Sequence, residues 1–430
     1  MFERSKSTQA DALRRASQAL PGGTVSSFRL PPEVAIVVSR GQGSHLWDLD
    51  GREYVDYVLG SGPLILGHAH PAVVQAVGEQ ITLGSHYYTL SEPAIRLAEE
   101  IIQAVPCAEK VRFAGTGSEA TFMALRLARA YTGRNKIMKF EGAYNGNHDY
   151  SMMSVSPTSP RAFPTPTPDT AGIPESLLGD VLVAPFNDTE TALAIMERNA
   201  RDLAAVILEP VQRIIAPKPG FLQALRTATR DLGIVLIFDE VVTGFRLAYG
   251  GAQEYYGVVP DLAAYGKIIG GGYPLAAVAG KAELMELCDS SRSGSPEYVY
   301  LSGTLNGNPV GAAAGLATLA ELRKPGRYER LHEAGERMRK RLATVFAERG
   351  IRAQAVGVGP LFRLVFTDRP IESYRDLLAS DRQRATKVGV ELLKRGFFVN
   401  PGDKVYISLA HSDDDLDSYV AAVAAILDEA

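Results

Sequence analysis

The sequence is poor in cysteine and has no long apolar run. Its two cysteines, Cys107 and Cys288, belong to no C-x-x-C pair, which argues against a disulfide framework and a zinc site and fits a reducing compartment. No uninterrupted apolar stretch is long enough to span a bilayer, and the first residues lack the apolar core of a secretory signal. We therefore expect a cytoplasmic protein with no membrane contact.

A basic tract is also missing. Acidic and basic residues are mixed along the chain, and the net charge is −4, so a nucleic-acid partner has little support. Histidines are numerous enough to suggest a metal, but the spacing of His68, His70, His86 and His148 fits no ligand pattern. We expect no metal site.

The chain does have length and an ordinary apolar content. It has 430 residues, which predicts two or three domains, and its 46% apolar and 22% charged residues are typical of a soluble globular protein. Through the middle, short apolar strands alternate with helices, the strand-like segments being 109–115, 135–140, 203–211 and 234–241, and the helix-like segments 118–133 and 220–233. This alternation predicts an α/β fold with a mostly parallel sheet covered on both faces.

The two ends of the chain have another pattern. Residues 34–58 contain DLDG, which is typical of a turn between two hairpin strands. From about residue 328 a long charged helix is followed by strand-like LFRLVF and KVYISLA and by further helices. We predict a large α/β domain over residues 62–325, and a smaller α+β domain built from residues 1–61 and 326–430.

Two local patterns give further expectations. In the helix at 118–133, Ala124, Leu127, Ala128 and Tyr131 recur at helical spacing and predict one buried face. Residues 156–174 are dense in proline, so they can form neither a regular helix nor a central strand. This segment is either a mobile surface loop or a lid beside the site.

A glycine loop precedes the helix at 118–133. Gly115, Gly117 and Ala120 fit the spacing G-x-G-x-x-A after a strand, and free amides at a helix N-terminus attract an anion. Glu141 follows the next strand at about the spacing of a dinucleotide fingerprint, whereas no G-x-x-x-x-G-K-[ST] occurs. The loop therefore predicts a phosphate site, and leaves open whether the phosphate belongs to a dinucleotide or to a smaller molecule.

A second pair of residues favours the smaller molecule. Asp239 ends a buried apolar strand, where open α/β sheets bind their ligands, and Lys267 lies further on among glycines and apolar residues. Desolvation disfavours the charged form of such a lysine and makes it a nucleophilic amine. A phosphate site, a buried aspartate and a nucleophilic lysine suit pyridoxal 5'-phosphate, with the lysine on the aldehyde and the aspartate on the pyridine nitrogen.

Nearly the whole chain resembles the class III pyridoxal-phosphate aminotransferases of fold-type I. The motifs that carry the resemblance are LGHAHP, GTGSEA, FEGAYNGNHD, ILEPVQ, FDEVVTGFR, PDLAAYGKIIGGGYPLAA and GTLNGNP. PGGTVSSFR, GPLILGHAHP and SLAHSDDDLD are closest to the branch of glutamate-1-semialdehyde 2,1-aminomutase and its aminotransferase relatives. The resemblance implies a fold-type I transferase that acts on a small-molecule amino donor and a keto acceptor, as a homodimer with active sites at the subunit interface.

The resemblance also implies roles for individual residues. Lys267 would form the Schiff base and act as the general base, and Asp239 would bind the ring nitrogen. The other residues implied in cofactor binding are Val241 and Tyr144 on the two ring faces, Gly117 and Ser118 on the phosphate, Thr304 on the phosphate of the neighbouring subunit, and Gln212 with Glu209 near the phenolic oxygen. The expected substrate contacts are Arg29, for a carboxylate, and Ser61, Tyr87 and Tyr273 as pocket walls.

Several departures from the mutase pattern favour a transaminase. Ser61 stands where the mutase has a tryptophan, Tyr273 replaces a methionine, and EPVQRI replaces E-P-V-x-G-N. Only Asp403 is near the position of the mutase's gating glutamate. We expect an aminotransferase for an amine or an amino acid, including β- and ω-amino acids, with the aminomutase as the alternative. A cofactor-binding protein without turnover and a dehydrogenase are weaker hypotheses.

Overall fold

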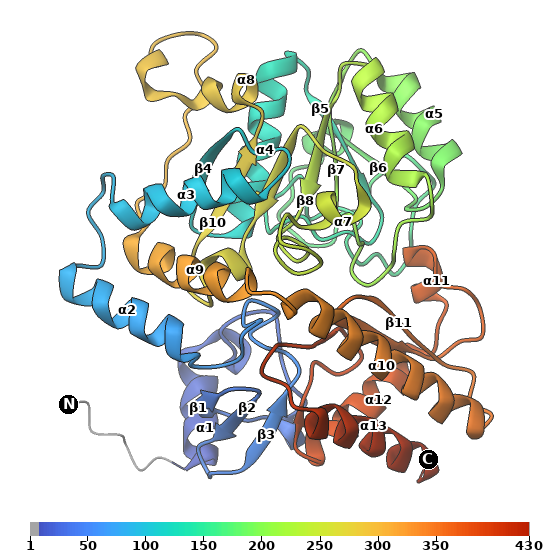
Figure 1. Ribbon diagram of the computed structural model, residues 1–430. Coiled ribbons are helices and arrows are strands. Elements are labelled where there is room, and N and C mark those ends of the chain that lie inside the picture. Colours follow the sequence, from blue (N-terminus) through green and yellow to red (C-terminus); the bar gives the residue numbers. More distant parts are fainter. Residues whose placement is uncertain (1–7, 430) are drawn as a thin grey trace.

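A seven-stranded sheet forms the centre of the computed structural model, which describes residues 8–429 (Figure 1). Its order is β4-β10-β9-β8-β7-β5-β6; the last five strands run parallel, and β10 is antiparallel to both of its neighbours. The strands are β4 (Lys110–Ala114), β5 (Lys136–Phe140), β6 (Val181–Ala184), β7 (Leu203–Leu208), β8 (Val235–Asp239), β9 (Leu262–Tyr265) and β10 (Ala276–Gly280). The predicted α/β fold with a mostly parallel sheet is confirmed.

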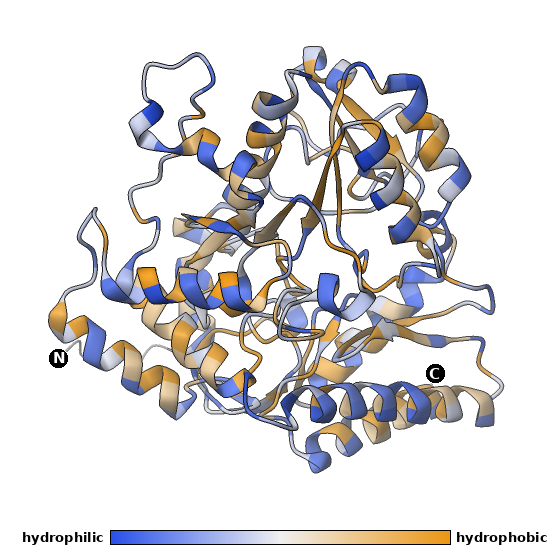
Figure 2. Ribbon diagram, turned by 45° about the horizontal axis from the view of Figure 1, so that its top comes forward, coloured by the Kyte–Doolittle hydropathy of each residue, from blue (hydrophilic) through white to orange (hydrophobic). Residues whose placement is uncertain are grey.

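Helices cover both faces of this sheet. The bounds of the helices in this half of the molecule are α2 (Pro71–Leu83), α3 (Glu92–Ala104), α4 (Gly117–Thr132), α5 (Thr189–Asn199), α6 (Phe221–Asp231), α7 (Ala252–Tyr256), α8 (Ala282–Met285) and α9 (Pro309–Leu322). Helix α4 packs across β10, β9 and β7 on one face, and α5 and α6 pack together on the other. The central strands are coloured as hydrophobic in Figure 2, as expected of strands buried on both faces.

Alternate residues of β8 pack into two separate apolar layers. Val235 and Ile237 join the layer under α4, while Leu236 and Phe238 join the layer under α5 and α6. Successive side chains of a strand point to opposite faces, so Asp239 continues the series of Val235 and Ile237. Its carboxylate therefore lies on the α4 face, at the carboxyl edge of the parallel strands.

Two smaller sheets lie at the opposite end of the molecule, where both chain ends meet (Figure 1). One has the order β1-β2-β3-β13, and Phe397 of the last strand pairs in parallel with Val55. The other has the order β11-β12-β14. The elements of this end are β1 (Val38–Gln42), β2 (His45–Asp48), β3 (Glu53–Asp56), β11 (Gln354–Val358), β12 (Leu361–Val365), β13 (Phe397–Phe398), β14 (Val405–Tyr406), α1 (Gln9–Ala19), α10 (Arg327–Glu348), α11 (Tyr374–Leu378), α12 (Arg382–Lys394) and α13 (Asp413–Asp428).

The predicted hairpin at DLDG is present, because β2 and β3 pair in antiparallel fashion across it. The domain boundaries at residues 61/62 and 325/326 remain predictions. Residues 1–7 and 430 of the predicted small domain lie outside the described residues. No helix within residues 8–429 is both long and apolar enough to cross a membrane.

Two local expectations differ from the structure. Tyr131 is 46% exposed because α4 ends at the next residue, beyond the edge of the layer that buries Ala124, Leu127 and Ala128. The strand expected over KVYISLA is only Val405–Tyr406. Beyond it the chain turns, because the Ser408 amide donates to Nδ1 of His411 at 3.0 Å instead of continuing the ladder. Residues 156–174 contain neither helix nor strand, as expected; whether they act as a lid is untested.

Candidate active site

The first turn of α4 leaves two amide groups free for a ligand. The Thr116 hydroxyl accepts the Glu119 amide at 3.3 Å, and the Glu119 carboxylate accepts the amides of Gly115 and Thr116 at 2.7 and 3.1 Å. Among the contacts of the described residues, the amides of Gly117 and Ser118 have no acceptor. Free amides at the positive end of a helix dipole form an anion site.

Close backbone packing explains the glycines around this turn. A Cβ on Gly117 would lie 2.9 Å from a methyl group of Val241, so only glycine lets the helix start approach that side chain. A Cβ on Gly146, whose φ is +110°, would lie 2.9 Å from the Cα of Ser118. The loop after β5, the loop after β8 and the start of α4 therefore meet at one point.

Asp239 lies at this meeting point and is only 5% exposed. One carboxylate oxygen accepts the side-chain amide of Asn145 at 3.0 Å, and the other accepts the backbone amide of Val241 at 3.1 Å. Burial, with the nearby charge of Glu209, raises the pKa of Asp239 to about 7. A carboxylate in this position is stabilised by a cationic or proton-donating ligand.

Lys267 faces the same space from the loop after β9. Its φ is +51°, an unusual value for a residue with a side chain, and Gly266 precedes it. Burial lowers the pKa of the Lys267 ammonium, and the charges of Lys404 and Arg246 lower it further. The environment therefore favours the neutral amine, which is the nucleophilic form.

Glu209 and Tyr144 complete the walls of the site. The Glu209 carboxylate accepts the backbone amide of Tyr144 at 2.9 Å and that of Arg213 at 3.2 Å, so one buried side chain holds two loops. The guanidinium of Arg213 lies 5.6 Å from the centre of the Tyr144 ring. Tyr144 itself is 41% exposed, which leaves one face of its ring available.

Together these groups surround a cavity of about 460 Å³. Eight of the predicted site residues line it, namely Ser61, Gly117, Ser118, Tyr144, Glu209, Asp239, Val241 and Lys267. The set fits pyridoxal phosphate: free amides and a hydroxyl for the phosphate, a buried carboxylate for the ring nitrogen, and a desolvated amine for the aldehyde.

The other predicted site residues lie outside this cavity. Gln212 is buried and donates to the Glu141 carbonyl at 2.7 Å. Arg29 is exposed, and Tyr87 donates its hydroxyl to the Leu83 carbonyl at 2.5 Å. Two more lie in separate cavities, Thr304 in a groove beside α3 and Tyr273 in a pocket beside α2.

Sequence reasoning missed several residues of the site. Asn145 holds Asp239, and the buried Tyr406 hydroxyl, close to Lys267, has no hydrogen-bond partner among residues 8–429. Arg213 and Lys404 line the cavity as well. Of these, only Asn145 and Arg213 lie in motifs that the sequence analysis singled out, so only they carried a usable signal.

The structure argues against a dinucleotide. Glu141, which a dinucleotide fingerprint would place on a ribose, is instead held by Arg375 in a two-pronged ion pair at 2.7 and 3.1 Å. Within residues 8–429, no group of three or more histidine, cysteine, aspartate or glutamate side chains could hold a metal ion.

Comparison with known proteins agrees with this geometry. The family model "Aminotransferase class-III" matches residues 29–427. A glutamate-1-semialdehyde 2,1-aminomutase of Desulfitobacterium hafniense (strain DSM 10664 / DCB-2) is 44% identical over 415 residues, which are 95% of each chain. An omega-transaminase from Sphaerobacter thermophilus is similar in structure, with a TM-score of 0.93, 39% identity, and coverage of 99% of this chain and 98% of its own. A transaminase structure with PLP (pyridoxal phosphate) bound has a TM-score of 0.89 and 32% identity, over 98% and 97% of the two chains.

Proposed function

Because the chain belongs to the class-III aminotransferase family and uses pyridoxal phosphate, we propose that it is a transaminase. It moves an amino group from an amine or an amino acid, including β- and ω-amino acids, to a keto acid or an aldehyde. The observation that carries the proposal is that Asp239, Lys267 and the first residues of α4, whose amides are free, line one cavity.

When bound, pyridoxal phosphate supplies an aldehyde that takes up the amino group and a ring that accepts electrons from the substrate carbon. Lys267 would hold the cofactor at its aldehyde, and its free amine would serve as the base for the proton on the substrate carbon that bears nitrogen. Its lowered pKa keeps it in the form that can accept this proton. The same amine can then return the proton at another carbon.

Asp239 keeps the ring nitrogen protonated through its buried carboxylate, and Asn145 holds that carboxylate in place. Val241 and Tyr144 would hold the two faces of the ring, and Gly117 and Ser118 would hold the phosphate through amides and a hydroxyl. Gln212 fixes the loop after β5 through the Glu141 carbonyl, and Glu209 fixes Tyr144. In these roles Gln212 acts through the loop rather than through direct contact.

Side chains on the substrate side favour transfer between molecules. Ser61 lines the cofactor cavity where the mutase pattern has a tryptophan, so an aromatic wall is missing there. Asp403 lines the cavity near the mutase's glutamate position but is held by Asn400 at 2.9 Å. We include Arg29, Tyr87 and Tyr273 in the substrate pocket of the assembled enzyme; in the single chain they lie outside the cofactor cavity.

Glutamate-1-semialdehyde 2,1-aminomutase is the second candidate. The names of the curated relatives, at 44% identity over 95% of the chain, favour it over the transaminase. A mutase would keep its substrate bound and return the amino group to the neighbouring carbon. Both candidate reactions use Lys267 and Asp239, and they differ in the product that is released: a keto product from the transaminase, and an isomerised amino product from the mutase.

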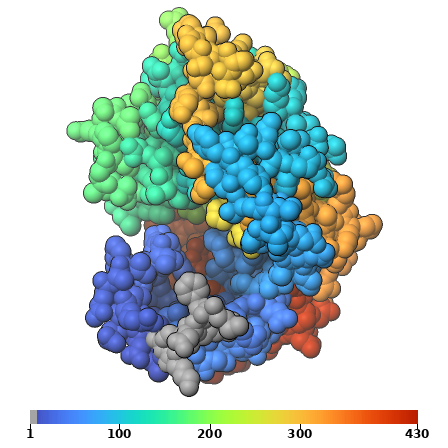
Figure 3. All heavy atoms as spheres, turned by 90° about the vertical axis from the view of Figure 1, so that its left-hand side faces the viewer, coloured from blue at the N-terminus to red at the C-terminus, as the bar shows by residue number. Residues whose placement is uncertain are grey.

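The proposal includes a homodimer with shared sites. Large apolar side chains are exposed around α2, α3 and the segment near residue 300, including Ile81, Leu83, Tyr88, Leu90, Tyr300 and Leu305. Figure 3 shows this face, with the 70–105 segment in bright blue beside the segment near residue 300 in gold. Thr304 lies in the groove of this face, where it would reach the phosphate of a neighbouring subunit. Two free cysteines support a cytoplasmic location.

A half-reaction without acceptor separates the two candidates. The protein loaded with pyridoxal phosphate is mixed with amines, β-amino acids or glutamate semialdehyde, with Lys267→Ala as control. Loss of the cofactor's visible absorbance with one equivalent of keto product supports the transaminase and identifies its donor class. Isomerised amino product from the semialdehyde, with no free keto product and full recovery of the absorbance, would overturn it in favour of the mutase.

A further inference from the structure

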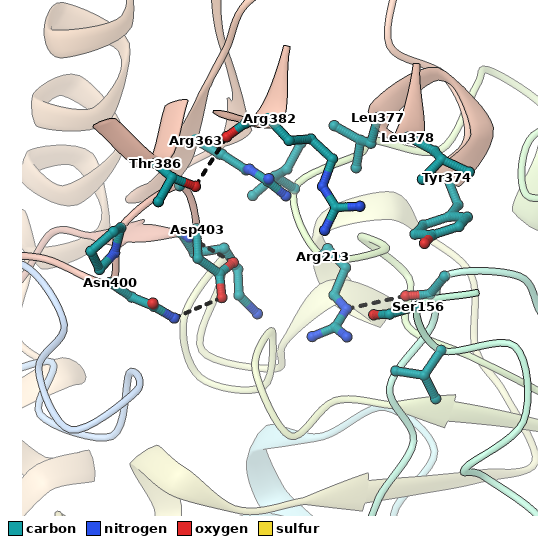
Figure 4. Close-up of a pocket in the computed structure, with 16 residues that line it drawn as sticks. Ser156, Arg213, Arg363, Tyr374, Leu377, Leu378, Arg382, Thr386, Asn400 and Asp403 are labelled. Atoms are coloured by element: carbon teal, nitrogen blue, oxygen red, sulfur yellow. Dashed lines mark hydrogen bonds between the residues drawn. The ribbon is translucent and has the colours of Figure 1, made fainter. Parts of the chain in front are cut away.

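A second cavity of about 280 Å³ adjoins the cofactor cavity, between the loops of the central sheet and the C-terminal elements (Figure 4). We call it the arginine cavity, because Arg213, Arg363 and Arg382 line it. Figure 4 shows the Arg382 side chain extending from the C-terminal elements toward Arg213. Arg213, Asp403 and Lys404 line both cavities, so the two cavities are neighbours.

The three guanidinium groups have almost no partners of their own. Arg213 donates Nε to the Gly142 carbonyl at 3.1 Å, which leaves its two terminal nitrogens without a bond among the described residues. Arg363 has a buried Nε without a partner. The side chains of Arg363 and Arg382 make no hydrogen bond or ion pair with any residue of 8–429, although many other arginines of this chain are paired.

The single acidic group of the cavity does not neutralise them. The Asp403 carboxylate accepts the side-chain amide of Asn400 at 2.9 Å and its neighbour's backbone amide at 2.8 Å, and it forms no ion pair within 4 Å. Burial opposes its ionisation, yet Lys404, Arg213 and Arg363 more than offset this and hold the pKa of Asp403 below its usual value. Three guanidiniums and one ammonium thus face one carboxylate.

The excess positive charge is costly unless an anion enters. Burial lowers the pKa of Arg363, and its neighbours Arg382 and Arg213 lower it further by repulsion. Buried charges in proteins are normally paired, and arginine forks match a carboxylate in a two-pronged way. The cavity is also large enough for a carboxylate group, since its volume is several times the roughly 30 Å³ that a water molecule occupies in the liquid.

We infer that the arginine cavity binds the distal carboxylate of a dicarboxylic substrate whose reacting carbon lies at Lys267. The inference rests on the proposed function, because it assigns the cavity to the keto acceptor or to the dicarboxylic amino acid formed from it. Arg363 provides the half-buried inner contact, Arg213 the wall shared with the cofactor cavity, and Arg382 the exposed rim. Monocarboxylic acceptors leave the guanidiniums unpaired and bind less well.

Binding of an unreactive dicarboxylate tests this directly. Glutarate and butyrate are titrated into the protein loaded with pyridoxal phosphate, by calorimetry. We expect glutarate to bind and butyrate to bind at least about tenfold more weakly. Arg363→Met and the less intrusive Arg382→Met should each weaken glutarate binding about tenfold, whereas Arg352→Met, at an exposed position that does not line the cavity, should not change it.

Three results would overturn the inference: equal affinity for glutarate and butyrate, glutarate binding unchanged in both cavity variants, or inorganic phosphate binding more tightly than glutarate and competing with it. The last would make the cavity a phosphate site. Acceptor kinetics add an independent measurement, since Arg382→Met should raise KM for 2-oxoglutarate relative to pyruvate. The donor half-reaction is run beside these tests. Its failure would contradict the transaminase proposal, whereas glutarate binding tests the ligand of the arginine cavity independently.

Discussion

Two neighbouring carboxylates at the end of β8, Asp239 and Glu240, lie on opposite sides of the sheet and differ in how they are held. Glu240 is fully buried, and its oxygens accept the Thr243 hydroxyl at 2.7 Å and the amides of Ala252 and Gln253 at 2.8 and 3.0 Å. Asp239 has two partners and faces the cofactor cavity. The Glu240 carboxylate stabilises the fold, and the Asp239 carboxylate remains available to a ligand.

The difference shows how a functional charge can be told from a structural one. Burial raises the pKa of both groups. For Glu240, several hydrogen bonds from within the fold support the charged form and the turn around it. For Asp239, the missing stabilisation must come from what enters the cavity, and the same holds for the guanidiniums of the arginine cavity.

Removing Lys267 should have the largest effect. Lys267→Ala takes away both the aldehyde-binding amine and the general base, so we expect turnover to fall by about 10⁴-fold. Steady-state product formation is the measurement, with circular dichroism to confirm the fold. Retention of more than a tenth of the activity would mean that another amine does the chemistry.

Asp239→Asn should rank next. The shape is kept but the charge opposite the ring nitrogen is lost, so we expect kcat to fall by about 10²- to 10³-fold while the thermal unfolding midpoint of the cofactor-free protein does not fall. An equal loss of stability would show that Asp239, like its neighbour, belongs to the fold.

Glu240→Gln should show the opposite pattern. The new amide would face the N–H donors of Ala252 or Gln253, which we expect to cost about 1–3 kcal/mol in the free energy of unfolding. The activity of the folded fraction should be kept, as measured after urea titration and an assay at matched folded concentration. Activity loss without destabilisation would contradict the comparison.

A smaller effect is expected from Gly117→Ala. The added methyl would press on Val241, so we expect affinity for pyridoxal phosphate to fall by about tenfold, with little change in kcat at saturation. Gly78→Ala, in α2, is the matched control: nothing lies within 4 Å of its Cβ, so it should leave cofactor affinity unchanged. Equal cofactor affinity of the two variants would contradict the role of Gly117 in cofactor binding.

The smallest expected effect concerns pH. The pKa of Asp239 is raised to about 7 in the fold, so between pH 4 and 7 the folded state binds more protons than the unfolded state. The stability that this proton gives is present at low pH and is lost as pH rises through about 7. Relative to Asp239→Asn, the free energy of unfolding of the cofactor-free wild type should fall by about 2 kcal/mol between pH 5 and 7, as measured by urea unfolding. A slope of opposite sign would mean that Asp239 is paired within the fold.

Local patterns were enough to predict four of the seven strands of the central sheet, β4, β5, β7 and β8. The apolar runs of β7 and β8 predict strands buried on both faces, and the alternation along β8 places Asp239 on the α4 face. The end of α4 was less predictable, since helical spacing cannot show that Tyr131 lies past the last covering residue. The short strand after Lys404 depends on a contact between Ser408 and His411 that competes with the ladder.

The site divides in the same way. Lys267, Asp239 and the glycine loop carry their chemistry in their own motifs, so sequence could predict them. Arg363 and Arg382 come from a strand and a helix far along the chain, in segments with no motif, and only the fold brings them beside Arg213. Tyr406 was missed for the same reason.

The central claim is that one amine, Lys267, binds the cofactor. Other candidates exist: Lys139 is fully buried with a pKa lowered to about 7, and Lys404 lines the same cavity. The protein loaded with pyridoxal phosphate is reduced with borohydride, digested and analysed by mass spectrometry. The account predicts a pyridoxyl group on the peptide that contains Lys267 and on no other. A label on Lys139 or Lys404, or an unlabelled Lys267 peptide, would contradict it.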